Sequence, residues 1–327
     1  MKNELLPTPK DLTLSEISER FATDDKAREY LEIIRWPNGP VCPHCKNADS
    51  QKIWKIEANP SKKVRAGLYQ CAECDKQFTV TIGTIYEDSH IPLRKWLVAW
   101  YLVCSAKKGI SALQIQRSLG LGSYRTAWMM MHKIRHAMKD PVFSGKLEGT
   151  VEIDETYVGG KPRPGDGKPR KAGRGTLHKV PVVALVERSG DVRTKVVANV
   201  SQKNLKSFIN KNVDKKTIVN TDQFCVYPTL VYPFVRHDVV NHSQKEYARH
   251  NADGTVSHVN SCESFFSLLK RGIVGAFHHV SPEHLPRYCD EFCFRWNHRK
   301  VTDGERMVAG MQGAEGKRLT YRLPVTK

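Results

Sequence analysis

The sequence predicts an α/β protein whose main domain is preceded by a cysteine-containing module and a basic helical module. Three observations lead to this fold class. Two Cys-x-x-Cys pairs lie within the first 80 residues, the segment 90–139 has the periodicity of helices, and a series of β-like runs begins at Val151. The chain has 327 residues, enough for two or three domains, and its 40% of apolar residues excludes wholesale disorder.

The net charge of the chain indicates which kind of partner it binds. Lysine and arginine (52) exceed aspartate and glutamate (34) by 52 − 34 = 18, a surplus that attracts a polyanion such as nucleic acid. Nine cysteines are an odd number, and the N-terminus lacks the apolar core of an export signal, so we expect a reduced, cytoplasmic protein. The longest strongly apolar run, 96–104, is too short to span a membrane.

Local patterns predict the order of the elements. AREYLEIIRW predicts a helix, whereas KIWKI, GLYQC and QFTVTIG predict short strands. The strings VEIDETYV, VPVVALVE, TKVVANV and TIVNTD predict further strands, a helix capped by Ser201 follows the third of them, and helices return from Ser257. The tail after residue 300 is expected to be weakly structured. The predicted segments are 1–35, 36–80, 90–140, 148–300 and 301–327.

The paired cysteines predict a structural zinc site. Cys42 and Cys45 form one Cys-x-x-Cys pair, Cys71 and Cys74 form another, and 25 residues separate the two pairs. Two such turns can bring four thiolates onto one tetrahedral Zn²⁺, and the spacer suits a β-hairpin between them. His44 lies inside the first pair and could replace a thiolate, but we interpret it as a spacer residue. The other five cysteines lack paired metal spacing.

The helical module concentrates positive charge. Residues 101–139 contain seven lysines or arginines and no acidic residue, and the helical run SALQIQRSL is followed by Gly120-Leu-Gly122 and a helix capped by Ser123. This layout predicts a helix-turn-helix whose second helix enters the DNA major groove. The candidate contacts are Tyr124, Arg125, Lys133 and Arg135. The alternative is an ordinary helical hairpin, in which Ala127, Met131, Ile134 and Met138 form a core stripe.

Three acidic residues in the β-rich part predict a magnesium site. Asp154 lies in VEIDETYV, Asp222 ends TIVNTD, and Glu263 lies early in a helical run that places Lys270 two turns further along the same face. Two aspartates on strands and one glutamate on a helix can converge at a sheet edge. Oxygen ligands of this kind suit paired Mg²⁺ ions, which clamp the oxygens of a phosphoryl transfer.

Several strings resemble a known family. EIDETYVGGK, NTD, HVNSCESFFSLLKRG, FHHVS and EFCFRWNHR resemble bacterial insertion-sequence transposases of the DDE class, in the ISXO-type branch with an N-terminal zinc ribbon. The resemblance implies an RNase H-like catalytic domain in which Asp154, Asp222 and Glu263 hold Mg²⁺ or Mn²⁺, while Lys270 and the adjacent Arg271 contact DNA. It also implies double-stranded DNA as partner and a homo-oligomer on that DNA.

The resemblance further implies a reaction. Water would attack the phosphodiester at the element's end, and the freed 3′ hydroxyl would attack target DNA. In this branch the third metal ligand is sometimes an asparagine, and Asn260 stands three residues before Glu263 on the same helical face. We favour Glu263, because a carboxylate binds Mg²⁺ better than an amide does.

Basic and histidine residues surround these motifs. The segment 160–179 contains seven lysines or arginines and a single acid, so it predicts either a DNA-contacting loop or a solvated face. Its candidate contacts are Arg170, Lys171 and Arg174. His237, His242 and His258 lie near the second and third motifs, where structural or DNA-facing roles are favoured, although His242 and His258 could assist proton transfer.

Three alternative functions share these features. A zinc-ribbon DNA-binding regulator explains the charge and the cysteines, but it leaves the three acids as a coincidence. A domesticated transposase without catalysis would keep the fold. An RNase H-like nuclease would share the metal site and differ by making no joined product.

Overall fold

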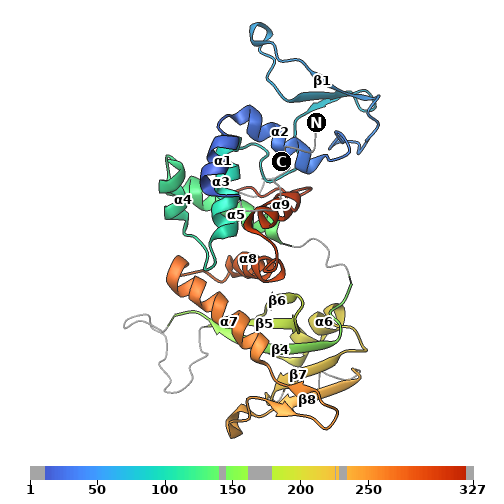
Figure 1. Ribbon diagram of the computed structural model, residues 1–327, viewed down its shortest axis with the longest axis vertical. Coiled ribbons are helices and arrows are strands. Elements are labelled where there is room, and N and C mark those ends of the chain that lie inside the picture. The colour runs from blue at the N-terminus through green and yellow to red at the C-terminus, as the bar shows by residue number, and fades with distance from the viewer. Residues whose placement is uncertain (1–11, 140–144, 161–178, 225, 228–233, 322–327) are drawn as a thin grey trace. The chain divides into compact units, whose positions relative to one another are not determined.

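The computed structural model describes residues 12–139, 145–160, 179–224, 226–227 and 234–321. The chain divides into two compact units, one formed by Met1–Lys139 with Lys300–Lys327 and the other by Asp140–Arg299 (Figure 1). Within the described ranges, no helix combines the length and the apolar character needed to cross a membrane. The finer division of the first unit into ribbon, helical module and tail stays a prediction.

A small antiparallel sheet in the first unit accompanies the cysteine pairs, the first pair preceding it and the second lying at the turn between its last two strands. Its strands β1 (Ile53–Ile56), β2 (Leu68–Cys71) and β3 (Lys76–Phe78) pair in that order. The ring of Trp36 packs edge-on against Tyr69 and Phe78, with centroids 5.4 and 5.8 Å away. The predicted hairpin between the two cysteine pairs is therefore confirmed, and a cluster of three aromatic rings forms its core.

Helices make up the rest of the first unit. They are α1 (Leu14–Arg20), α2 (Asp24–Arg35), α3 (Leu93–Ser105), α4 (Ala112–Leu119), α5 (Tyr124–Met138) and α9 (Asp303–Gln312). The predicted cap is present, because the Ser123 hydroxyl accepts the Thr126 N–H at 3.1 Å. Gly120 ends α4 with φ of +56°, a left-handed conformation that favours glycine. The predicted stripe of Ala127, Met131, Ile134 and Met138 is buried.

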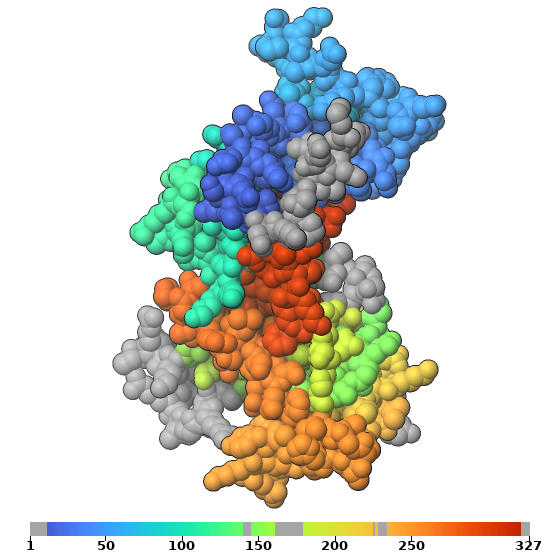
Figure 2. All heavy atoms as spheres, viewed as in Figure 1, coloured from blue at the N-terminus to red at the C-terminus, as the bar shows by residue number. Residues whose placement is uncertain are grey.

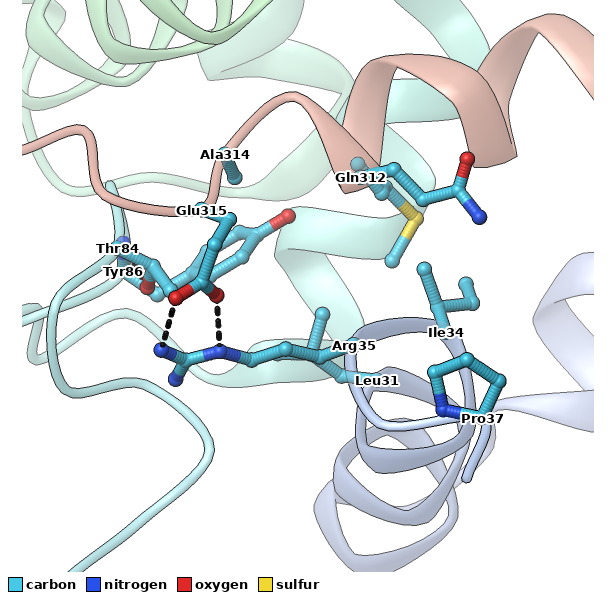
Figure 3. A pocket seen from close by; sticks show the side chains of 10 residues that line it. Leu31, Ile34, Arg35, Pro37, Thr84, Tyr86, Gln312, Ala314 and Glu315 are labelled. Atoms are coloured by element: carbon cyan, nitrogen blue, oxygen red, sulfur yellow. Dashed lines mark hydrogen bonds and ion pairs between the residues drawn. The ribbon is translucent and has the colours of Figure 1, made fainter. Parts of the chain in front are cut away.

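The expectation of a weakly structured tail is wrong. Thr302 and Glu305 form a reciprocal capping box that starts α9, and Met307 and Met311 are buried where α9 packs on α3. Beyond the helix, the Glu315 carboxylate accepts a fork of two hydrogen bonds from Arg35 of α2, beside a cavity of about 260 Å³ (Figure 3). Residues 302–315 are therefore an integral part of the first unit.

Gly310 of α9 is required by close packing, and its replacement should destabilise the first unit. A Cβ built on Gly310 would lie 2.5 Å from the indole of Trp100, which is fully buried and donates to the Tyr86 hydroxyl at 2.8 Å. We expect Gly310→Ala to lower the free energy of unfolding by about 1–3 kcal/mol, the usual cost of overpacking. Urea unfolding measures this value. Gly122→Ala is the matched control, since nothing lies within 4 Å of its built Cβ.

The second unit is built on a five-stranded mixed sheet in the order β6-β5-β4-β7-β8. The bounds are β4 (Thr150–Val158), β5 (Val180–Glu187), β6 (Val192–Val196), β7 (Ile218–Asp222) and β8 (Arg236–Val240). Strands β4, β5 and β6 pair antiparallel, whereas β7 runs parallel to both β4 and β8. Four of these strands match the predicted runs, and β8 was not predicted.

Helices cover both faces of this sheet. On one face, α7 (Asn260–Gly272) and α8 (Leu285–Asn297) pack on apolar residues of β5 and β6, while α6 (Gln202–Asn212) packs on the other face. Figure 1 shows α7 running across the strands, and its outer side is part of the orange surface in Figure 2. Ser201 stands at the N-cap of α6 as predicted, but its side chain makes no capping hydrogen bond.

Short elements complete the described chain. A hairpin of β9 (Arg249–His250) and β10 (Val256–Ser257) precedes α7, so this helix begins at Asn260 rather than at Ser257 as predicted. Among the described residues, 3₁₀ segments also lie at Pro60–Lys62 and His242–Gln244, and a π-helical extension of α7 covers Ile273–Phe277.

Candidate functional site

The four predicted zinc ligands converge on one point. The Sγ atoms of Cys42 and Cys74 are 3.7 Å apart, those of Cys45 and Cys71 are 3.6 Å apart, and all four lie within 4.8 Å of one another. Tetrahedral Zn²⁺ with bonds of about 2.3 Å requires sulfur separations of about 3.8 Å. The cluster therefore suggests a closed, structural Zn²⁺ site, and His44 is not part of it.

The second unit brings the three predicted acids to one region. In the parallel register of β4 and β7, Ile153 pairs with Thr221, so Asp154 and Asp222 follow at the same level on neighbouring strands. Residues alternate in direction along β4, which sends the Asp154 side chain to the face covered by α7. Glu263 is the fourth residue of that helix, and its side chain is 51% exposed.

The electrostatic environment of Asp154 links these carboxyl groups, but among the described residues only the four cysteines bring their ligand atoms close enough together to hold a metal ion. The pKa of Asp154 is raised well above its ordinary value, first by burial and then by the negative charges of Glu155, Asp222 and Glu263. Glu155 points to the opposite face, where the Tyr227 hydroxyl donates to it, and burial raises the pKa of Glu155 too. Sequence reasoning missed Glu155. This crowding of negative charge would be relieved by a bound cation.

Histidines and a further glutamate, Glu152, lie near these acids. His242 Nδ1 is 3.7 Å from Glu263 Oε1, and His237 Nε2 is 2.8 Å from the Thr221 hydroxyl. His258 Nδ1 is 3.1 Å from Oε1 of Glu152, a fully buried residue that sequence reasoning also missed. The available signal was the alternation of VEIDETYV, which places position 152 on the same face as Asp154.

The predicted site residues Asn260, Lys270 and Arg271 also lie on α7, the helix that carries Glu263. Asn260 opens α7 and is exposed, so it stands one turn before Glu263 as predicted. Lys270 and Arg271 are exposed in the last turn, where the Arg271 Nε donates to the Ser267 carbonyl at 3.2 Å. One helix therefore carries both the third acid and two cations.

Comparisons with known proteins identify the family. Residues 146–297 match the ISXO2-like transposase domain, and residues 22–77 match a transposase zinc-ribbon domain. A protein from Halobacterium salinarum, described as an uncharacterized protein in transposable element ISH50, is 32% identical over 293 residues. That alignment covers 84% of this chain and 91% of the relative. The chain belongs to the ISXO2-like transposases. The first match spans β4 to α8, and the second spans both cysteine pairs.

The predicted DNA contacts of this ISXO2-like transposase differ in their exposure. Arg125 is exposed at the start of α5, and its guanidinium lies 3.9 Å from the centre of the Tyr321 ring. Lys133 is half-buried, and its amine donates to the Glu87 carbonyl at 3.4 Å. Arg135 is only 2% exposed, so its side chain cannot reach a phosphate and that prediction is wrong. Arg170, Lys171 and Arg174 lie outside the described residues.

Proposed function

We propose that this protein is a metal-dependent DNA transposase that cuts the ends of its element and joins them to target DNA. The observation that carries the proposal is the placement of Asp154 and Asp222 at the same level of two neighbouring parallel strands, with Glu263 on the helix that covers this sheet. We further propose that the second unit is an RNase H-like domain. The support is its mixed sheet, in which three antiparallel strands are followed by two parallel ones, with acids on β4 and β7.

The donor set fits magnesium or manganese. All three groups are carboxylates, the oxygen ligands that these cations prefer, and the mutual repulsion around Asp154 favours cation binding. Bound Mg²⁺ would supply the positive charge that stabilises the attacking and leaving oxygens of an in-line displacement. Asp154 and Asp222 offer oxygens from a rigid sheet, and the exposed side chain of Glu263 leaves one side open to DNA.

The proposed reaction has two chemical steps. Water attacks the phosphodiester at the element's end and leaves a 3′ hydroxyl, which then attacks a phosphodiester of target DNA. In the second step, one phosphodiester bond of the target DNA breaks as a new one forms to the 3′ end of the element. The chain's surplus of 18 positive charges favours binding of both DNA partners. We also propose that the protein acts as an oligomer, because two ends must be joined together.

A joining assay tests the proposal. Purified protein is incubated with labelled DNA carrying the element's flanking ends, a target plasmid, and Mg²⁺ or Mn²⁺. We expect end cleavage and labelled plasmid that require the divalent cation. Tight binding of the ends with neither product would instead support a DNA-binding regulator, and cleavage without labelled plasmid would support a nuclease.

Lys270 should contribute a DNA contact near the cut. Its ammonium group is exposed on the helix that carries Glu263, so its loss removes one attraction to phosphate without opening a cavity. We expect Lys270→Ala to slow joining by about 10-fold and to lower the salt dependence of DNA binding by about one unit of slope.

The matched control for Lys270 is Lys206→Ala. Lys206 is exposed on α6, which covers the opposite face of the sheet. Both variants should keep the wild-type melting temperature. Equal joining rates for Lys270→Ala and Lys206→Ala would make Lys270 an ordinary surface residue.

A further inference from the structure

Glu152 is a buried carboxylate that the proposed chemistry does not use. It lies on β4 two residues before Asp154, is 0% exposed, and points to the face that α7 covers. A carboxylate in such a position is costly unless hydrogen bonds and opposite charges surround it. Its partners therefore indicate what it holds in place.

One set of partners belongs to the first turn of α7. Glu152 Oε2 accepts the backbone N–H of Ser261 at 2.7 Å and that of Cys262 at 3.3 Å, and Oε1 accepts the Ser261 hydroxyl at 3.0 Å. Val259, at the N-cap, provides no side-chain hydrogen bond of its own. A strand residue 109 positions earlier thus caps the helix and meets the positive end of its dipole.

A second set of partners of the Glu152 carboxylate consists of Arg188 and His258. Arg188 follows β5, and its Nε and Nη2 atoms donate to Glu152 Oε1 at 3.3 and 3.2 Å. The Nη1 atom of the same guanidinium donates to the Val256 carbonyl in β10 at 2.7 Å. His258 Nδ1 lies 3.1 Å from Glu152 Oε1. The sheet, the hairpin before α7 and the helix are joined through this one carboxylate.

We propose that Glu152 is the positioning residue that sets the place of Glu263 relative to Asp154. Ser261 and Cys262 immediately precede Glu263, so fixing their amides fixes the backbone from which the third acid projects. Glu152 also shares β4 with Asp154, and its backbone carbonyl accepts the Cys262 thiol at 3.3 Å. The inference rests on the proposed function, because it concerns how these acids hold a divalent cation.

The test compares metal binding by the wild type and Glu152→Gln, using the full zinc-loaded chain. Glutamine keeps the size of the side chain, but it turns one acceptor oxygen into an amide donor that faces the donors Arg188 and Ser261. We expect Mn²⁺ to bind about 10–100-fold more weakly, as when supporting residues of metal sites are lost. Electron paramagnetic resonance of free Mn²⁺, without DNA, measures this affinity.

A second readout separates positioning from general damage. The Mn²⁺ concentration for half-maximal joining should rise by the same factor, while affinity for the DNA ends stays close to wild type. The melting temperature of the zinc-loaded protein should fall, because Arg188 loses its charged partner, but the protein should stay folded at the assay temperature. Glu187→Gln is the matched control on β5. Its carboxylate accepts a long hydrogen bond of 3.4 Å from the Glu148 amide rather than capping α7, so Mn²⁺ affinity should not change.

Three outcomes distinguish the possibilities. Wild-type Mn²⁺ affinity in a folded Glu152→Gln protein overturns the positioning role and leaves the transposase proposal intact. If the wild type neither joins DNA nor binds Mn²⁺ more tightly than Asp154→Asn does, both proposals fail.

If Glu152→Gln does not fold, the variant Ser261→Ala tests the positioning role instead, because it removes only the hydroxyl bond to Glu152 Oε1. It should weaken Mn²⁺ binding about 3-fold, and an unchanged affinity overturns the inference.

Discussion

Asp154→Asn should abolish joining while leaving DNA binding intact. The substitution removes a negative charge and one metal-binding oxygen from the strand position beside Asp222, and the other acids cannot replace either. Loss of a residue that supports a metal ligand already lowers metal affinity or activity about 10–100-fold. Loss of the ligand itself should therefore lower the joining rate at least about 1000-fold. The labelled-plasmid assay measures the rate, and a gel-shift titration of the element's ends measures binding.

The same substitution should stabilise the metal-free protein. Burial and neighbouring acids raise the pKa of Asp154, which means that its ionised form is disfavoured in the folded state. Replacing that charge by a neutral amide should raise the free energy of unfolding by about 0.5–2 kcal/mol, the common gain from relieving a strained functional site. Asp191→Asn, in the exposed turn between β5 and β6, is the matched control and should change neither property. A less stable Asp154→Asn protein with wild-type joining would refute both expectations.

Cys42→Ser should release zinc and unfold the small sheet of β1, β2 and β3. The substitution removes one of four thiolates that converge within 4.8 Å, and the remaining core there consists mainly of Trp36, Tyr69 and Phe78. Structural zinc contributes about 10–16 kcal/mol to the folding of comparable small modules, far more than three rings can replace. Zinc content by elemental analysis should fall from one to zero per chain.

Limited proteolysis locates the damage. Cleavage should appear within 46–70, between the two cysteine pairs, while the second unit stays resistant because it has its own core. Cys104→Ala is the control. Cys104 is a buried cysteine of α3 outside the metal cluster, so this variant should keep its zinc. Full zinc content in Cys42→Ser would show that this cysteine is not a ligand.

The sequence predicted the elements that carry the candidate site, because each has a strong local signal. The Cys-x-x-Cys spacing identified the metal cluster, and the β-rich runs identified the strands of Asp154 and Asp222. Strand pairing is not a local property. Only the fold shows that β4 and β7 are parallel neighbours, which is what places these two aspartates at the same level.

Tertiary packing explains what the sequence did not predict. Helix α9 depends on Gly310 fitting against Trp100, a contact between distant segments that no periodicity signals. Arg135 carries a charge and therefore suggested a DNA contact, yet the fold buries it. Glu152 lies in the run VEIDETYV beside Asp154, but its proposed role depends on partners on α7 and just after β5, which no local pattern shows.

We propose that carboxylates of the second unit place a divalent cation directly on the scissile phosphate. Sulfur substitution of one non-bridging oxygen at that phosphate tests it, because Mn²⁺ accepts sulfur ligands more readily than Mg²⁺ does. We predict that one diastereomer is cleaved poorly with Mg²⁺, that Mn²⁺ restores its cleavage, and that Asp154→Asn shows no restoration. Equal cleavage of both diastereomers with Mg²⁺, at the rate of the unmodified DNA, would contradict the claim.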